Sequence, residues 1–225
     1  MQTQNAPTDL IFKLWPWLEA NRNKLIGVAV AIAVAAGIFY YATARQAQKE
    51  IDAGEALTQL LITPNANASA GQIADAFTQL AGRYSGTVAG KRAQLQAAAS
   101  LFEASRYADA QAQFQIFLAA DSSGPLAASA QLGVATCLEA QGKLDDAATA
   151  YRKVTSQFAD SAAALSAKFS LGRLAEAKGN NTEAMNYYQE IARNNLAGSL
   201  AQEAAMRAAD LKTKLASATK PAAKS

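Results

Sequence analysis

The sequence predicts an all-α fold, with a single N-terminal transmembrane helix followed by an α-solenoid of helical hairpins and a C-terminal capping helix. Three observations support this prediction. Residues 25–44 contain no charged side chain over twenty positions. The chain after them lines up with itself at a shift of 37 residues. Within each repeat, apolar side chains recur at spacings of three and four, which is the periodicity of a helix.

The uncharged stretch from Leu25 to Ala44 has the length of a membrane-spanning helix. At about 1.5 Å of rise per residue, it crosses the roughly 30 Å hydrocarbon core of a bilayer. Two tryptophans precede it, and tryptophan favours the boundary between water and lipid. Residues 1–24 are therefore expected to be a cytoplasmic stub with an aromatic interfacial segment, and residues 25–44 the transmembrane helix. The A-x-A pattern at Ala42-Thr43-Ala44 leaves cleavage as a secretory signal open.

The orientation of this helix follows from charge and size. Three basic residues precede it (Lys13, Arg22 and Lys24) and two follow closely (Arg45 and Lys49). The positive-inside rule thus mildly favours a cytoplasmic N-terminus. A short stub before the helix and a long polar domain after it favour the same orientation.

The repeat is visible as sets of matching positions 37 residues apart. Size and polarity are kept within each set. The sets are Ala98, Ala135 and Gly172; Leu95, Leu132 and Phe169; Ser105, Gly142 and Gly179; Ala110, Ala147 and Ala184; Phe114, Tyr151 and Tyr188; and Phe117, Val154 and Ile191.

Each repeat is predicted to be a helix, a short turn and a second helix. Glycine at the turn, as at Gly142, suits a left-handed C-cap that residues with a Cβ adopt less easily. The small residue at Ala135 or Gly172 is expected to let the paired helix approach closely. The ring at Tyr151 or Tyr188 is expected to fill the space between units.

The repeats set the expected domain boundaries. Residues 45–71 form a connecting helix and loop, which is part of a degenerate first repeat. Residues 72–198 hold the repeats, residues 199–218 form the amphipathic capping helix that such arrays require, and residues 219–225 form a disordered tail.

Composition excludes several classes of function. From residue 46 onward there are 17 Lys and Arg against 16 Asp and Glu, interspersed, which gives no basic surface for nucleic acid. The chain has no histidine, which removes Ser-His-Asp triads and ordinary zinc sites. The one cysteine, Cys137, lies in an apolar pattern and is expected to be buried and inert. We therefore expect no enzyme activity, no cofactor, no metal and no small-molecule substrate.

The repeat pattern resembles the tetratricopeptide repeat. The residues that carry this resemblance run from Leu171-Gly172 through Gly179 to Ala184 and Tyr188. The resemblance implies a solenoid of tetratricopeptide-like hairpins that binds proteins or peptides on the face lined by the first helix of each repeat. The implied groove residues are Arg92, Leu95, Ala99, Phe102, Ser129, Leu132, Thr136, Glu139, Ser166, Phe169, Arg173 and Glu176.

The character of this groove follows from the same positions. Members of the repeat family that bind a C-terminal carboxylate use Lys, Asn and Arg here, whereas this chain has Leu95, Leu132, Thr136 and Phe169. An apolar groove with a mildly polar rim is therefore expected to hold an extended or helical polypeptide. The alternative is that Leu95, Leu132 and Phe169 belong only to the core of the repeats.

The whole arrangement resembles the ancillary subunit of the bacterial Sec translocon. The residues that carry this second resemblance are Trp17 to Val28 and Phe39-Tyr40-Tyr41, followed by the repeat domain. It implies a single-pass protein of the bacterial inner membrane with a periplasmic repeat domain. The implied partners are the translocon, a periplasmic chaperone and exported chains. The alternatives are a structural scaffold for cell-envelope assembly or cell division, and an adaptor of inverted topology that faces the cytosol.

Overall fold

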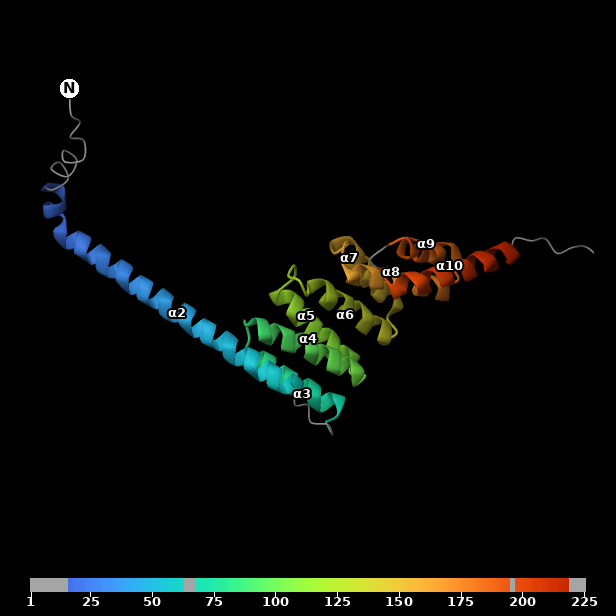
Figure 1. Ribbon diagram of the computed structural model, residues 1–225, viewed down its shortest axis with the longest axis horizontal. Coiled ribbons are helices and arrows are strands. Elements are labelled where there is room, and N and C mark those ends of the chain that lie inside the picture. Colours follow the sequence, from blue (N-terminus) through green and yellow to red (C-terminus); the bar gives the residue numbers. More distant parts are fainter. Residues whose placement is uncertain (1–15, 63–67, 195–196, 219–225) are drawn as a thin grey trace, which may run out of the picture. The chain divides into compact units, whose positions relative to one another are not determined.

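The computed structural model describes residues 16–62, 68–194 and 197–218, and no strand occurs in these ranges. Its named helices follow one another along the chain in Figure 1. They are α2 (Arg22–Ile62), α3 (Ala70–Arg83), α4 (Val88–Glu103), α5 (Tyr107–Ala120), α6 (Ala127–Ala140), α7 (Leu144–Gln157), α8 (Ala162–Ala177), α9 (Asn181–Ala192) and α10 (Ser199–Ala218). The predicted disordered tail, most of the stub and the first part of the 63–71 loop lie outside the described residues.

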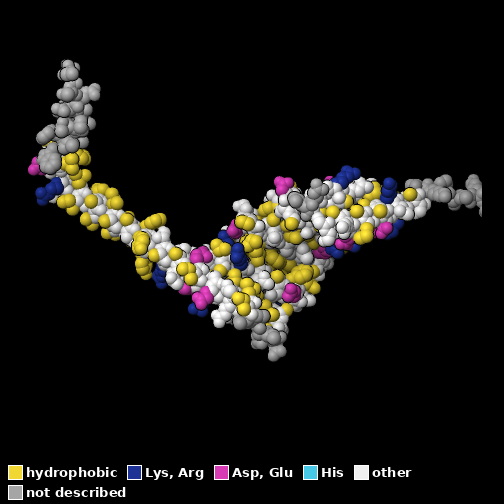
Figure 2. All heavy atoms as spheres, viewed as in Figure 1, with side chains coloured by type: hydrophobic (Ala, Val, Ile, Leu, Met, Phe, Trp, Pro, Cys, Tyr) yellow, Lys and Arg dark blue, Asp and Glu magenta, His cyan; other side chains and the backbone are white. Residues whose placement is uncertain are grey.

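The chain divides into two compact units, Met1–Asp52 and Ala53–Ser225. In the first unit, the apolar side chains of α2 are exposed, as Figure 2 shows in yellow. Ile32, Ile38 and Phe39, for example, are 64%, 65% and 72% exposed. By length and composition, α2 is the one helix of the described residues that could cross a membrane.

The second unit is a stack of antiparallel helix pairs. From α3 to α10, each helix packs on the next one in the chain, and Figure 1 shows the pairs in sequence order. The last turns of α2 pack with α3, because Ala53 and Leu57 share a buried cluster with Phe77 and Leu80. The first helices also contact one another, α4 with α6 and α6 with α8. The all-α solenoid prediction is confirmed.

Two of the three first helices, α4 and α8, begin at hydrogen-bonding caps, whereas α6 follows Leu126 and has none. Thr87 and Ser161 have extended backbones, and their hydroxyls accept hydrogen bonds from the backbone N–H groups of Gly90 and Ala164. The second helices α5, α7 and α9 lack such a cap but carry an acidic residue in the first turn, as Asp109 and Glu183 do. A negative charge there interacts favourably with the helix dipole.

The turns inside the repeats have the predicted left-handed conformation. Gly142 and Gly179 have φ angles of 76° and 78°. Ser105, at the matching position of the preceding repeat, has a φ of 59° and is the one non-glycine residue with positive φ among the described residues. The turn geometry is therefore kept where the glycine is absent.

The core is made of rings and branched chains set among many alanines. Tyr151 and Tyr188 are 1% and 0% exposed, and they are among the largest fully buried side chains of the described residues. Tyr151 packs with residues of α6, α7 and α8, so it spans the junction between two repeats. Tyr188 packs with residues of α8, α9 and α10. Loss of either ring is expected to cost roughly 3 to 5 kcal/mol.

Candidate interaction surface

The twelve predicted groove residues lie on the first helices α4, α6 and α8, which contact one another in turn. None of them is fully buried. Arg92, Ser129 and Arg173 are exposed, and the other nine are partly exposed. We call this set the inner-helix surface. The fold therefore leaves every one of these side chains with some accessible area.

Three of the four large apolar members of the surface also pack on buried clusters, Phe102 among them. Leu132 lies against the buried cluster that contains Tyr151. The ring of Phe169 lies with its centroid 5.4 Å from that of Tyr188, in a tilted arrangement. Leu95 is likewise partly exposed and lines a pocket. These side chains thus stabilise the repeats and still present apolar area on the surface.

A network on α6, α7 and α8 fixes the middle of the surface. The Tyr151 hydroxyl donates a hydrogen bond to Glu139 Oε2 at 2.6 Å, and Arg173 Nη2 contacts Glu139 Oε1 at 2.5 Å. Burial and the Glu139 hydrogen bond raise the pKa of Tyr151 to about 12, so its hydroxyl stays protonated and keeps donating at neutral pH. The ion pair is partly exposed and is expected to contribute at most about 1 kcal/mol.

The next repeat carries a similar arrangement. The Tyr188 hydroxyl donates to Glu176 Oε2 at 3.2 Å, and Arg207 Nη1 of α10 lies 3.6 Å from the same oxygen. The Arg207 guanidinium also lies over the rings of Phe169 and Tyr188, at 5.4 and 5.9 Å from their centroids. Desolvation and the negative charge of Glu176 raise the pKa of Tyr188. The charges at this end of the surface are therefore neutralised within the chain.

Arg92 differs from the other charged members of the inner-helix surface. It forms no ion pair or hydrogen bond through its side chain with any described residue, whereas Glu139, Arg173 and Glu176 are all paired. It lines a pocket of about 440 Å³ with Leu57, Leu95 and Leu126. This end of the surface thus combines an apolar recess with an unpaired positive charge.

The sequence reasoning missed part of this recess. Leu57 and Leu61 come from the last turns of α2, in the degenerate first repeat, where the 37-residue match is weak. Their spacing of four was the available signal, since it places both side chains on one face of a helix. Leu126 lies immediately before α6 and has no counterpart among the matched positions.

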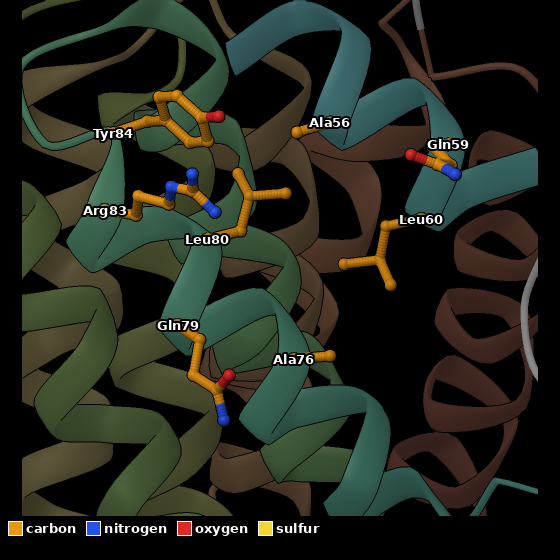
Figure 3. A pocket seen from close by; sticks show the side chains of 8 residues that line it. All are labelled: Ala56, Gln59, Leu60, Ala76, Gln79, Leu80, Arg83 and Tyr84. Atoms are coloured by element: carbon orange, nitrogen blue, oxygen red, sulfur yellow. The ribbon is translucent and has the colours of Figure 1, made fainter. Parts of the chain in front are cut away.

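A second recess lies in the first hairpin, between the last turns of α2 and α3. It has a volume of about 360 Å³. Figure 3 shows Leu60 of α2 and Leu80 of α3 beside the gap between the two helices, with Arg83 and Tyr84 at one end. The Arg83 guanidinium lies 5.5 Å from the centre of the Tyr84 ring. Apolar and polar side chains both line this recess, as they do in a side-chain pocket for a polypeptide.

The described residues contain no constellation that indicates catalysis. They include no group of three or more Cys, Asp or Glu side chains placed to hold a metal ion. The Cys137 thiol is fully buried, and burial raises its pKa to about 11, so it is protonated and poorly nucleophilic at neutral pH. The prediction that this thiol is buried is confirmed.

A comparison with protein families agrees with the repeat architecture. A family model described as a tetratricopeptide repeat-like domain matches residues 15–155. Crystal structures of TPR-like repeats assigned to a kinesin light chain of Podosopora anserina match with 15% identity. One covers 77% of this chain and 96% of that chain with a TM-score of 0.47, and the other covers 78% and 97% with a TM-score of 0.46. The comparison with curated proteins found no match.

Proposed function

Because the chain belongs to the tetratricopeptide repeat-like domain family, a scaffold for contacts between proteins, we propose that it is a membrane-anchored, non-enzymatic adaptor. The proposed location is the bacterial inner membrane, with the N-terminus in the cytoplasm and the repeats in the periplasm. There the repeat domain would bind exported chains or a periplasmic chaperone beside the Sec translocon. The tetratricopeptide fold itself accounts only for protein binding.

The observation that carries the proposal is the apolar area on the inner-helix surface. Leu95, Leu132 and Phe169 stand at equal intervals on three successive first helices and are all partly exposed. An exported chain before folding offers apolar side chains, and its backbone can add hydrogen bonds to the polar rim. Internal pairing of Glu139 and Glu176 leaves little free charge in the middle of this surface, which suits binding of many different sequences.

The membrane anchor rests on α2. Its exposed apolar side chains would be buried by lipid, which favours insertion of the segment. The mass of the mature protein tests this part of the proposal. A mass that includes residues 1–44 supports permanent anchoring, whereas a mass that begins after Ala44 shows a cleaved signal and contradicts it.

The topology can be tested with one engineered thiol. Ser217 is exposed near the end of α10, and the native Cys137 is fully buried, so a Ser217→Cys variant has a single accessible thiol among the described residues. We expect a membrane-impermeant maleimide to label this variant in intact spheroplasts. Labelling only after lysis would place the repeats in the cytosol and favour the inverted topology.

The partners can be tested by photo-crosslinking in native membranes. A photoreactive amino acid at Leu95 or Leu132 is expected to capture exported chains, a chaperone or translocon subunits, more strongly when secretion is increased. The same amino acid at the exposed Gln202 of α10 is the control. Products dominated by wall-synthesis or outer-membrane assembly proteins would instead support a scaffold for the cell envelope. Equal products from all three positions would contradict a role for the inner-helix surface.

A further inference from the structure

A pocket outside the inner-helix surface lies where α5, the loop after it, α6 and α7 meet. It has a volume of about 670 Å³. Its polar lining includes Gln131 of α6, Lys153 and Gln157 of α7. Leu118, Val134 and Phe158 supply apolar area. It shares no residue with the twelve inner-surface positions, so it is a separate candidate site.

Gln131 is the unusual member of this pocket. Gln131 is only 6% exposed, yet its side-chain amide forms no hydrogen bond with any described residue. Buried amides in folded proteins nearly always have a partner. Among the described residues, every side-chain polar atom that is completely enclosed has one. The Gln131 amide is therefore not completely enclosed. It is accessible from the pocket and has no hydrogen-bond partner among the described residues.

The following repeat shows which groups stand at the matching positions. Thirty-seven residues after Gln131 and Lys153 stand Lys168 of α8 and Glu190 of α9. Lys168 Nζ and Glu190 Oε2 form an ion pair at 2.7 Å between the two helices of that hairpin. There, a carboxylate from the second helix meets a donor from the first.

The middle repeat has donors at both of these positions and no carboxylate. Gln131 can donate through its amide, and Lys153 has no ion pair or side-chain hydrogen bond with any described residue. In the preceding repeat, formed by α4 and α5, the matching Gln94 donates to Gln113 at 3.5 Å, and the position matching Lys153 is the apolar Ile116. Only the middle repeat thus combines an unpartnered amide, an unpaired ammonium and a pocket.

We propose that this pocket binds an acidic side chain of a partner protein. The carboxylate would accept hydrogen bonds from Gln131 Nε2 and Lys153 Nζ, as the Glu190 carboxylate accepts from Lys168. Apolar residues next to the acidic one in the partner would cover Leu118, Val134 and Phe158. A polypeptide fits better than a free carboxylate, because the pocket is much larger than one carboxylate and has apolar and amide groups around the two donors.

The test uses the full chain in lipid nanodiscs, with the side-chain amide of Gln131 observed by NMR after selective labelling of glutamine. The probe is a capped peptide, acetyl-Ala-Leu-Glu-Leu-Ala-amide, and its control has Gln in place of Glu. We expect the Glu peptide to shift the Gln131 signal at a concentration at least about tenfold lower than the Gln peptide requires. A tenfold difference corresponds to about 1.4 kcal/mol. Absence of a shift, or equal shifts by both peptides, would overturn the proposal.

Variants and a small carboxylate complete the test. Lys153→Met is expected to abolish the preference for the Glu peptide, whereas Lys212→Met, which changes another exposed lysine on α10, should leave it unchanged. The double variant Gln131→Lys with Lys153→Glu recreates the ion pair of the next repeat and should block the Glu peptide; because this variant lacks the Gln131 signal, its binding is compared with wild type by titration calorimetry. If Lys153→Met keeps the preference, or if sodium glutarate shifts the signal as effectively as the Glu peptide, the proposed polypeptide site is wrong.

Discussion

The ring of Tyr188 occupies the space that a side chain at position 172 would need. A Cβ built on Gly172 would lie 2.7 Å from Tyr188 Cε1 and 3.0 Å from Cζ. The glycine on α8 therefore lets the second helix of the hairpin approach with its ring in place, as the repeat pattern predicted. Gly133 has the same relation to Phe114 of the preceding repeat, with 2.5 Å to Cζ.

Gly172→Ala is expected to destabilise the repeat domain. Alanine in a helix interior normally stabilises by up to about 1 kcal/mol relative to glycine. Overpacking of a full core costs about 1 to 3 kcal/mol, and we expect a net loss of about 1 to 2 kcal/mol. Chemical denaturation of the full chain in detergent measures it. Gly54→Ala is the matched control, because nothing lies within 4 Å of its added Cβ. A Gly172 variant as stable as wild type would contradict the contact.

Ser105→Gly is expected to stabilise the domain. Ser105 has a φ of 59°, a conformation that costs a residue with a Cβ about 1 to 2 kcal/mol. Glycine removes this cost but loses more backbone entropy on folding, so the net gain should be about 0.5 to 1 kcal/mol. Thermal unfolding measures it. The reverse change, Gly142→Ser in the next repeat, should lower stability, and similar unfolding midpoints for both variants would refute the prediction.

Tyr151→Phe is expected to flatten the alkaline limb of the stability curve. The pKa of Tyr151 is raised to about 12 in the folded chain, against about 10 for an unfolded tyrosine. Stability linked to this group is therefore complete below about pH 10 and is lost as the pH rises towards 12. Denaturant midpoints across this range measure the effect. Glu139→Gln should lower the Tyr151 pKa, seen in the ultraviolet absorbance of tyrosinate, and an unchanged titration would show that Glu139 does not matter.

The pair of Lys91 and Asp121 predicts an acid dependence. Lys91 Nζ donates to Asp121 Oδ2 at 2.8 Å, and this hydrogen bond is the largest cause that lowers the pKa of Asp121. The associated stability is present above the ordinary pKa of about 3.9 and is lost as the pH falls through the lower folded value. Lys91→Met should reduce the slope of stability against pH below about 4. Lys143→Met, which removes an exposed lysine, should not.

The thiol of Cys137 is expected to resist modification in the native state. It is fully buried, and its pKa is raised to about 11, so both access and thiolate are lacking at neutral pH. Reaction with a maleimide should become fast only when denaturant unfolds the repeats. Rapid labelling of the native protein would show that α6 opens locally under native conditions.

The 37-residue period was enough to predict a set of buried positions that recurs from repeat to repeat. Phe117, Val154 and Ile191 occupy matching positions, and all are at most 1% exposed. The period works because each repeat places an apolar residue at the same junction between helices. Matching positions are therefore buried in each repeat. Phe114 departs from this rule, since it is partly exposed where Tyr151 and Tyr188 are buried.

The start of α3 shows a local signal that the period obscured. The predicted loop ran to residue 71, whereas α3 begins at Ala70. Ser69 accepts a hydrogen bond from the Gln72 backbone N–H, and the Gln72 side chain accepts one from the Ser69 backbone N–H. This reciprocal capping box is readable from Ser69-Ala-Gly-Gln72 alone and marks the first turn.

Contacts that do not obey the period could not be predicted from it. Glu139 and Arg173 are 34 residues apart, and Arg207 reaches Glu176 from α10. Which long side chains meet depends on helix positions in space, and a partly exposed pair contributes too little energy to leave a sequence pattern. The unpartnered amide of Gln131 became visible only beside the geometry of Lys168 and Glu190.

Because each buried cluster joins helices of neighbouring repeats, a single hairpin cut out of this chain would expose part of its core. Tyr151, for example, needs Leu171 and Leu174 of α8 as well as its own hairpin. The smallest autonomous fragment should therefore contain at least two hairpins and the helix that follows them. A fragment made for binding studies is expected to fold only when it keeps the helices that pack on both sides of every buried ring.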